Sequence, residues 1–600
     1  MSPPPDSLVL GATGFIGRWL LAELLRRGHS VAAGVRGGPD REPYLRDWLR
    51  AHDAPVDRLS VVHVDITRPG LDLDGAAARH LAQVRDVHNC ASLFRFGLAR
   101  QEARAVNVDG ARNVLAWAAG LSGLRRVVHI TGYRVAAHPG DPAGIARLYR
   151  KAGAYEASKV EADATVRALA ERDGLPLSIV NPSTVIGHSA TGEAGQYLGL
   201  AETVRTLWQG RLRLLPGGEA TFVPVVAVDH LARFLAEVPG RDTGGVRAHW
   251  VLDETTPNLP ELVAHLADHL GVPAPRRSVP TALLRRLPRA VTRVEPETLP
   301  FLAADRYDTA SAHALARTAG LRHPPVRDAL SRWADRLVAD GFGALPPGRP
   351  GGLHPVAGSR TYLVGERAAP DYVLLHGLPL DGESWQDVAD RLDGSTLVPD
   401  LPGLGRSAPA RVPAEVWLAE LLAPAATRPV LVGHSAGCAP ALRHAHAHPD
   451  RVAALVLVAP AFLQPHASPL LRIRPLARRA LARMTPGRLA AFTGLGEEAA
   501  GHRAVASAAL NLRRSGAAAR AAAHLAAARR PAERAALRNL LAACPVPVTL
   551  VVGEHDPVDA SGLDVPVVTV PAAGHYPQLT AAQAVAEQIT RAAAEARAAA

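Results

Sequence analysis

Short apolar runs alternate with longer amphipathic segments along the first part of the chain. The runs have the length and composition of buried strands and lie at residues 7–10, 30–35, 59–64, 84–92 and 127–130. The segments between them have the spacing of helices that pack one face against a sheet. Strands that alternate with helices in this way predict an α/β fold built on a parallel, doubly wound sheet.

The same pattern starts again after a stretch rich in proline and glycine at residues 344–352. Further apolar strands are predicted at residues 372–375, 396–399, 430–432, 454–458, 548–552 and 567–570. A helical insert rich in alanine and arginine fills about residues 461–540. We therefore expect two domains, residues 1–343 and 358–600, joined by a linker at residues 344–357.

Composition agrees with two globular domains. The chain has 600 residues, of which 48% are hydrophobic and 20% charged, and this length is too great for one core. Its net charge of +11 comes from scattered arginines, so we do not expect it to bind nucleic acid. Cys90, Cys438 and Cys544 form neither a disulfide framework nor a metal-ligand pattern. Without a signal peptide or a membrane-spanning run, the sequence predicts a soluble cytoplasmic protein.

A glycine-rich turn follows the first predicted strand. The sequence Gly11-Ala-Thr-Gly14-Phe-Ile-Gly17 lies between a strand and a helix, which is the context of a dinucleotide site. Gly11 allows a tight turn, Gly14 lets the backbone approach a pyrophosphate, and Gly17 lets helix and strand pack closely. The start of the helix offers free N–H groups to the phosphates. The cofactor contacts expected here are Gly11, Thr13, Gly14, Phe15, Ile16 and Gly17.

Residues after the next two strands indicate which dinucleotide binds. Arg36 follows the second strand, where an acidic residue would accept hydrogen bonds from the ribose of NAD. An arginine suits the 2′-phosphate of NADP instead, so NADPH is the expected cofactor. Asp65 and Ile66 follow the third strand and are placed to contact the adenine.

Tyr155 and Lys159 are candidates for proton transfer. Residues four apart on a helix share one face, so the phenol and the ammonium can point into the same cleft. A neighbouring cation favours the phenolate and makes the tyrosine a better proton donor. Lys151 and Lys159 are the only lysines of this arginine-rich chain, which favours a site that needs a compact ammonium.

Two further motifs, Asn107-Val-Asp-Gly110 and Asn181-Pro-Ser183, complete a pattern that resembles the extended short-chain dehydrogenases/reductases, including thioester reductases, over about residues 6–340. The resemblance implies a Rossmann-type fold with a smaller substrate region from about residue 185. It implies that Tyr155 is the general acid/base and that Lys159 lowers its pKa and holds the nicotinamide ribose. It also implies cofactor contacts at Asn107, Pro182 and Ser183.

The catalytic hydroxyl is the departure from this family. Its members usually carry two consecutive hydroxyl residues after the strand at 127–130, whereas here Thr131 is followed by Gly132. Depending on the alignment, the hydroxyl that binds the substrate oxygen belongs to Thr131 or is missing at Gly132.

The second domain carries a nucleophile elbow. Gly433-His-Ser435-Ala-Gly437 follows an apolar strand and precedes a helical segment, and small residues flank the serine because the turn is tight. Asp556 and His575 each follow a later strand, so the chain order is serine, aspartate, histidine. This pattern resembles the α/β-hydrolase family, which implies that Ser435 is the nucleophile, His575 the base and Asp556 its orienting partner.

The hydrolase resemblance has two more implications. The backbone N–H groups of Leu378 and Ala436 would form the oxyanion hole, and the insert at residues 461–540 would be a helical cap over the active site. The basic segment Arg472–Arg479 in this insert could alternatively lie on a membrane surface, but we favour a cap with a solvated basic face.

We expect a bifunctional enzyme that acts on small molecules. An NADPH-dependent reductase of carbonyl compounds or acyl thioesters is joined to a serine hydrolase of esters or thioesters. The first domain could alternatively be an NAD(P)-dependent epimerase/dehydratase, although residues 185–330 carry no obvious diphosphate-binding cluster. It could also be a regulator that binds NADP without chemistry. The second domain could be an inactive hydrolase scaffold, although every position of the triad is filled.

Overall fold

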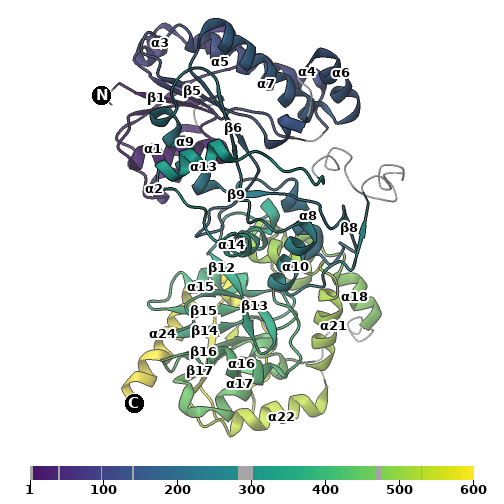
Figure 1. Cartoon of the computed structure of the whole chain (residues 1–600). Coiled ribbons are helices and arrows are strands. Elements are labelled where there is room, and N and C mark those ends of the chain that lie inside the picture. Colours follow the sequence, from purple (N-terminus) through teal and green to yellow (C-terminus); the bar gives the residue numbers. More distant parts are fainter. Residues whose placement is uncertain are drawn as a thin grey trace. The chain divides into compact units, whose positions relative to one another are not determined.

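The computed structural model describes residues 4–37, 41–95, 97–137, 141–280, 302–465, 474–528 and 530–599. The chain divides into two compact units (Figure 1). Unit 1 comprises residues 1–202, 213–266 and 275–333, and unit 2 comprises residues 203–212, 267–274 and 334–600. Within the described ranges, no helix combines the length and the apolar character needed to cross a membrane.

Unit 1 is built on a sheet of seven parallel strands in the order β10-β6-β5-β4-β1-β2-β3. The strands are β1 (Ser7–Leu10), β2 (Val31–Val35), β3 (Leu59–His63), β4 (Asp86–Asn89), β5 (Arg126–Ile130), β6 (Leu177–Pro182) and β10 (Arg247–Val251). The first five coincide with the predicted apolar runs. Strand order runs outward from β1 in both directions, so the predicted doubly wound sheet is confirmed.

Helices cover both faces of this sheet because each presents an apolar face to it. Helices α1 (Phe15–Arg26) and α9 (Val228–Arg241) pack on one face, and α5 (Gly110–Ala118) and α7 (Ala154–Asp173) pack on the other. Other helices are α2 (Arg41–Ala51), α3 (Gly75–Leu81), α4 (Arg100–Ala103), α6 (Pro142–Lys151), α8 (Leu200–Trp208), α10 (Leu259–Leu270), α13 (Ala310–Thr318) and α14 (Val326–Ala339). Two small parallel sheets pair β7 (Thr184–Ile186) with β9 (Val225–Ala227) and β8 (Leu214–Pro216) with β11 (Arg277–Val279).

Unit 2 has an eight-stranded sheet in the order β12-β13-β15-β14-β16-β17-β18-β19. Its strands are β12 (Gly351–Val356), β13 (Ser359–Gly365), β14 (Tyr372–Leu375), β15 (Thr396–Pro399), β16 (Val430–His434), β17 (Ala454–Val458), β18 (Val548–Gly553) and β19 (Val567–Val570). β13 is antiparallel to both of its neighbours, and the strands from β15 onward are parallel. The expected linker at residues 344–357 therefore needs a correction, since its second half is strand β12 of this sheet.

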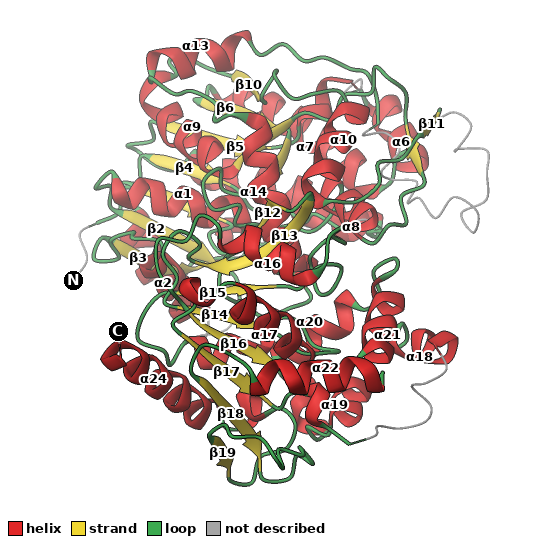
Figure 2. Cartoon of the chain, turned by 90° about the horizontal axis from the view of Figure 1, so that it is seen from below, coloured by secondary structure: helices red, strands yellow, loops and turns green. Residues whose placement is uncertain are grey.

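The helices of unit 2 fall into two groups (Figure 2). Those that follow the strands are α15 (Gln386–Ala389), α16 (Ala414–Leu422), α17 (Cys438–Ala447), α23 (Pro577–Thr580) and α24 (Ala582–Ala599). Between β17 and β18 lie α18 (Arg474–Leu481), α19 (Pro486–Thr493), α20 (Arg503–Asn511), α21 (Ala517–Ala527) and α22 (Pro531–Ala542). This second group is the predicted helical insert. Residues 472 and 473 of its basic segment lie outside the described residues, and the remainder starts α18.

Candidate active sites

The glycine turn between β1 and α1 is shaped by close backbone contacts. Gly11 has a φ of +73°, and a Cβ on it would lie 2.7 Å from the Ala91 nitrogen. A Cβ on Gly17 would lie 2.2 Å from the Gly11 carbonyl oxygen. Only glycine fits either position. Gly14 begins α1 without a side-chain capping bond, so the first N–H groups of the helix are left for an anion such as a pyrophosphate.

Arg36 and Asp65 lie at the carboxyl ends of the adjacent strands β2 and β3. Arg36 is exposed, and the Asp65 Oδ1 atom accepts hydrogen bonds from the Thr67 backbone nitrogen and hydroxyl at 2.9 and 2.7 Å. Burial works to raise the pKa of Asp65, but these bonds and the charge of Arg36 outweigh it and hold the pKa below its ordinary value. Ile66 is close to helix α5, since a Cβ on Gly110 would lie 2.8 Å from its Cδ1.

Asn107 lies in a π-helical turn, Arg104–Asp109, directly before α5. Its Oδ1 accepts a hydrogen bond from the Leu93 backbone nitrogen at 2.8 Å, and its Nδ2 donates to the Ser158 hydroxyl at 2.9 Å. Ser158 stands between Tyr155 and Lys159 on α7. Because both ends of the Asn107 amide are engaged within the protein, its side chain links the segment after β4 to the helix that carries the candidate proton donor.

Tyr155 and Lys159 lie in the first two turns of α7 and face unlike surroundings. Tyr155 is half-buried with its ring 4.7 Å from that of Phe94. Burial, together with the charge of the adjacent Glu156, raises the pKa of the Tyr155 phenol. The Lys159 ammonium is 7% exposed, and burial lowers its pKa to about 8. The lysine is therefore charged at neutral pH and loses its proton within a mildly alkaline range.

Two buried hydroxyls end the neighbouring strands β5 and β6. Thr131 and Ser183 are each 5% exposed, and neither hydroxyl has a hydrogen-bond partner among the residues that the structure describes. Buried polar groups are normally paired, so both are ready to bind a molecule that enters the site. A Cβ on Gly132 would meet no atom within 4 Å, so there is room for a side chain at this position. The absence of a second hydroxyl is therefore not imposed by packing. Since Gly132 has no side chain, the hydroxyl at the end of β5 is that of Thr131.

The glycine turn and these hydroxyls together fit a nicotinamide dinucleotide. The turn provides close backbone approach for the phosphates at one end, and Thr131, Ser183 and Lys159 provide polar groups at the other. No group of three or more metal-ligating side chains occurs in the described part of the chain.

A buried ion pair that sequence reasoning missed joins the two catalytic segments of unit 1. The Arg134 Nε atom lies 3.2 Å from Glu156 Oε1, and both side chains are 8% exposed. Arg134 follows Thr131 by three residues, and Glu156 is next to Tyr155. The pair therefore fixes the loop after β5 against the start of α7. Its partners are 22 residues apart and share no local pattern, so nothing in the sequence identified them.

In unit 2, the elbow after β16 has the backbone strain expected of a nucleophile turn. Ser435 has a φ of +49°, which is unfavourable for a residue other than glycine. A Cβ on Gly433 would lie 2.7 Å from the Cys438 Cα, and one on Gly437 would lie 2.6 Å from the Leu375 oxygen. Both flanking glycines are thus required by close packing, and the serine is held clear of the sheet.

The structure brings the three predicted triad residues together. His575 Nε2 lies 3.0 Å from Ser435 Oγ, and His575 Nδ1 lies 3.2 Å from Asp556 Oδ2. The Asp556 side chain is 1% exposed and the His575 side chain is 24% exposed, so the carboxylate is buried and the base is reachable. His434 Nε2 lies 2.8 Å from the His575 carbonyl oxygen, a contact that holds the loop carrying His575.

The segment that carries Leu378 runs beside the nucleophile. A Cβ on Gly377 would lie 2.8 Å from the Ser435 Cβ, so only glycine allows this approach. The Leu378 carbonyl accepts a hydrogen bond from the Tyr576 hydroxyl at 3.1 Å, which fixes the segment. This arrangement is compatible with the expected oxyanion hole at the N–H groups of Leu378 and Ala436.

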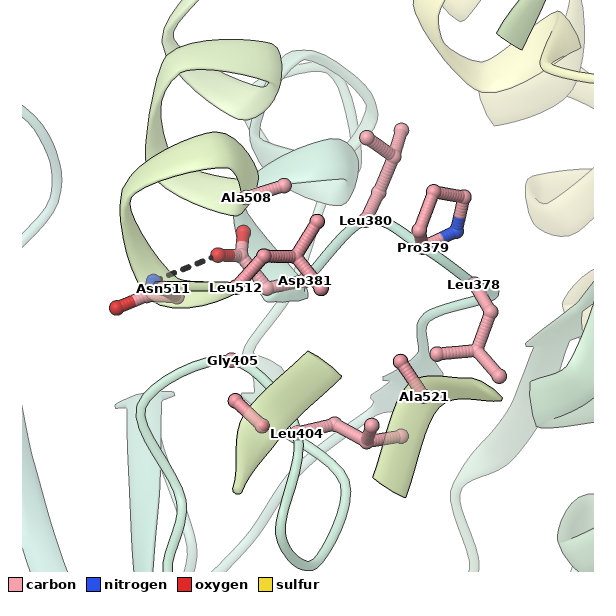
Figure 3. A pocket seen from close by; sticks show the side chains of 11 residues that line it. Leu378, Pro379, Leu380, Asp381, Leu404, Gly405, Ala508, Asn511, Leu512 and Ala521 are labelled. Atoms are coloured by element: carbon pink, nitrogen blue, oxygen red, sulfur yellow. Dashed lines mark hydrogen bonds between the residues drawn. The ribbon is translucent and has the colours of Figure 1, made fainter. Parts of the chain in front are cut away.

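A narrow cleft lies beside Leu378, between the loops that follow β14 and β15 and helices α20 and α21 (Figure 3). Its apolar lining consists mainly of Leu378, Pro379, Leu380, Leu404, Ala508, Leu512, Ala517 and Ala521. At one side the Asp381 carboxylate accepts a hydrogen bond from Asn511 at 2.9 Å. The lining of the cleft is therefore apolar except at this side.

Asp381 belongs to a buried charged network that holds this wall of the cleft. The Arg406 guanidinium, 1% exposed, lies 2.7 Å from Asp400 and 2.5 Å from Glu383. Glu383 also pairs with Arg503 of helix α20 at 2.8 Å. Burial and the neighbouring Asp400 carboxylate raise the pKa of Asp381. The network ties the Leu378 segment to the helical insert. Sequence analysis assigned no role to these residues.

Gln464 is the other residue of this site that sequence analysis missed. Its Nε2 atom lies 2.6 Å from Asp556 Oδ1 and 2.6 Å from His575 Nδ1. It follows β17 at the start of the insert, and no motif in that stretch distinguishes it from an ordinary loop residue. The only available signal was its position after a strand end.

Comparison with known proteins also distinguishes two parts of the chain. Residues 9–235 match the family model described as male sterility protein, an NAD-binding family, and residues 372–588 match that of the alpha/beta hydrolase family. A 3-diazoavenalumate denitrifying reductase from Streptomyces sp is 31% identical over 333 residues, which cover 54% of this chain and 99% of that protein.

Two further relatives represent the two halves. A pimeloyl-[acyl-carrier protein] methyl ester esterase from Vibrio atlanticus (strain LGP32) is 41% identical over 93 residues, which cover 15% of this chain and 36% of that protein. The terminal R domain from the myxalamid PKS-NRPS biosynthetic pathway is a solved structure with a TM-score of 0.47 and 23% identity, covering 57% of this chain and 93% of that one.

Proposed function

We propose that the chain is a bifunctional enzyme, on the premise that its first half matches the NAD-binding male sterility protein family and a known reductase, and its second half matches the alpha/beta hydrolase family. Unit 1 would be an NADPH-dependent reductase of a carbonyl compound or acyl thioester. Unit 2 would be a serine hydrolase of esters or thioesters. The observation that carries the proposal is that each unit contains a full set of reactive groups of its own.

The reductase reaction would use three residues, Thr131 after β5 and Tyr155 and Lys159 on α7. When bound, NADPH would supply a hydride. Thr131 would donate its unpaired hydroxyl hydrogen bond to the substrate oxygen, and Tyr155 would give that oxygen a proton. Lys159 would stabilise the phenolate that remains. Asn107 would position α7 for this reaction rather than bind the cofactor itself, because its amide is already engaged.

The hydrolase reaction would follow the serine mechanism. Ser435 Oγ would attack the acyl carbon while His575 takes its proton, and Asp556 would stabilise the imidazolium that forms. The N–H groups of Leu378 and Ala436 would bind the oxyanion. Transfer of the His575 proton to the leaving group and hydrolysis of the acyl enzyme by water would complete the cycle. The apolar lining beside Leu378 favours an acyl compound as the substrate.

Cofactor choice gives a first prediction. Replacing Arg36 with alanine should lower kcat/KM for NADPH by about 10- to 100-fold, the effect of losing one or two charge-assisted hydrogen bonds to the 2′-phosphate. The value for NADH should change little, since NADH has no phosphate there. Steady-state kinetics with both cofactors would measure the ratio.

Arg58 provides the control for this experiment. It is also an exposed arginine of unit 1, but it lies directly before β3, at the amino ends of the strands, and donates to the Gly28 carbonyl at 2.7 Å. Arg58→Ala should leave both cofactors unaffected. An Arg36→Ala enzyme that loses NADPH and NADH activity equally would contradict the expected recognition of the phosphate.

One experiment tests the proposal as a whole. The purified protein is incubated with NADPH and, in parallel, with panels of acyl thioesters, aldehydes and aryl esters, and absorbance and products are followed. We expect oxidation of NADPH with at least one thioester or aldehyde and NADPH-independent cleavage of at least one ester. If hydride returned to the substrate without net oxidation of the cofactor, unit 1 would be an epimerase rather than a reductase.

A further inference from the structure

The contacts of Gln464 define the proton positions in the hydrolase site. Its side-chain amide approaches two groups at 2.6 Å, an oxygen of Asp556 and the Nδ1 atom of His575. The Asp556 carboxylate can only accept hydrogen bonds when it is ionised, so the group that faces it must be the NH₂ end of the amide. A carbonyl oxygen at 2.6 Å from a carboxylate oxygen would be repelled.

The same nitrogen lies 2.6 Å from His575 Nδ1, close enough to donate its second hydrogen to that atom. A ring nitrogen that accepts a hydrogen bond carries no proton, so in this arrangement the proton of a neutral His575 is on Nε2. Nε2 is the atom that lies 3.0 Å from Ser435 Oγ. In this tautomer the imidazole donates to the serine and has no lone pair available to take its proton. Asp556 lies farther from Nδ1, at 3.2 Å, than Gln464 does.

We propose that Gln464 holds the hydrolase site in a resting tautomer, and that its amide must leave His575 Nδ1 before Ser435 is activated. This inference rests on the serine hydrolase function proposed above. Once the amide moves away, Nδ1 can carry the proton and donate it to Asp556 Oδ2, which frees the Nε2 lone pair for Ser435. Gln464 is thus a positioning residue that acts through His575 and takes no part in bond formation.

The backbone around Gln464 keeps its side chain in place. Arg534 of helix α22 donates hydrogen bonds to the carbonyls of Phe462, at 3.2 Å, and of Gln464 itself. The Asp559 nitrogen donates to the Leu463 carbonyl at 2.8 Å, which joins the same short segment to the loop that follows Asp556. The segment is held on both sides, so release of Nδ1 requires only a rotation of the Gln464 side chain.

Gln464→Met tests the inference, because methionine keeps the length and volume of the side chain but cannot donate a hydrogen bond. Histidine-labelled protein would be studied by ¹⁵N NMR, which reports which ring nitrogen of His575 carries the proton. The wild type should have the proton on Nε2, and Gln464→Met should have it on Nδ1. Hydrolysis of p-nitrophenyl acetate should become about three- to tenfold faster in the variant, the effect of removing one competing hydrogen bond.

Three comparisons make the outcome decisive. Gln464→Ala should also be faster, whereas Gln583→Met, which changes an exposed glutamine of the same unit, should match the wild type. A slower Gln464→Met enzyme, or the same His575 tautomer in wild type and variant, would overturn the inference. If Ser435→Ala hydrolysed the ester as fast as the wild type, the proposed hydrolase function would fail instead, and the NMR result would still decide the role of Gln464.

Discussion

Replacing Ser435 with alanine should reduce ester hydrolysis by roughly 10⁴- to 10⁶-fold while leaving oxidation of NADPH unchanged. The methyl group cannot attack the acyl carbon, and the slow reaction that remains would come from binding and the oxyanion hole alone. NADPH oxidation should persist because the reductase groups of unit 1 include no atom of the triad. The two activities would be measured in one preparation, by release of p-nitrophenol and by loss of absorbance at the cofactor band.

Two related variants test whether the three triad residues act as a unit. His575→Ala should lose about as much activity as Ser435→Ala, and the double variant should lose hardly more than either alone. His555→Ala should keep its activity, because this exposed histidine is next to Asp556 but is not part of the triad. Loss of both enzymatic activities in Ser435→Ala would contradict two independent sites, and unchanged hydrolysis would mean that unit 2 is a scaffold.

The parts of the sites that follow from sequence are those produced by local geometry. A Cβ at Gly17 or Gly433 would collide with nearby backbone, so these positions must be glycine and the motif can be recognised in the chain. The turn at Ser435, where φ is strained, requires small neighbouring residues, so this motif can also be recognised in the chain. The alternation of apolar runs and amphipathic helices likewise predicts both sheets. Buried strands are apolar, and each helix that covers a sheet turns one apolar face towards it.

The parts that did not follow from sequence depend on contacts between distant residues. Gln464 and His575 are 111 residues apart, and Arg503 and Glu383 are 120 apart. An isolated glutamine or arginine has no periodic pattern, and only the folded chain brings such residues beside their partners. The boundary of the linker was missed for another reason. β12 contains glycine and proline residues typical of a linker, but as an edge strand it needs hydrogen bonds on one side only.

Tyr155→Phe should lower kcat of the reductase by about 10²- to 10⁴-fold with little change in the affinity for NADPH. Phenylalanine keeps the ring that packs on Phe94 but has no proton to give to the substrate oxygen. Binding of NADPH, measured by fluorescence titration, separates loss of chemistry from loss of cofactor. Tyr44→Phe, which removes the hydroxyl of an exposed tyrosine in the same unit, should behave as the wild type.

The pH dependence of the reductase gives the same pair of residues an independent test. In the proposed mechanism, reduction needs a proton on Tyr155 and a charged Lys159. Burial lowers the pKa of Lys159 to about 8, whereas that of Tyr155 is raised, so the lysine is the first of the two to lose its proton as the pH rises. The rate of reduction should therefore be constant below about pH 7 and fall as the pH passes through 8.

The lowered pKa of Lys159 also affects the stability of unit 1. Between pH 8 and the ordinary value of 10.5, the unfolded chain holds a proton on this lysine that the folded chain has lost. The unfolded state binds more protons in this range, so the contribution of Lys159 to the free energy of unfolding should rise with pH. The rate of reduction would fall over the range in which this contribution grows. A rate that stayed constant up to pH 10, or a Tyr155→Phe enzyme as fast as the wild type, would show that unit 1 binds NADP without using this pair.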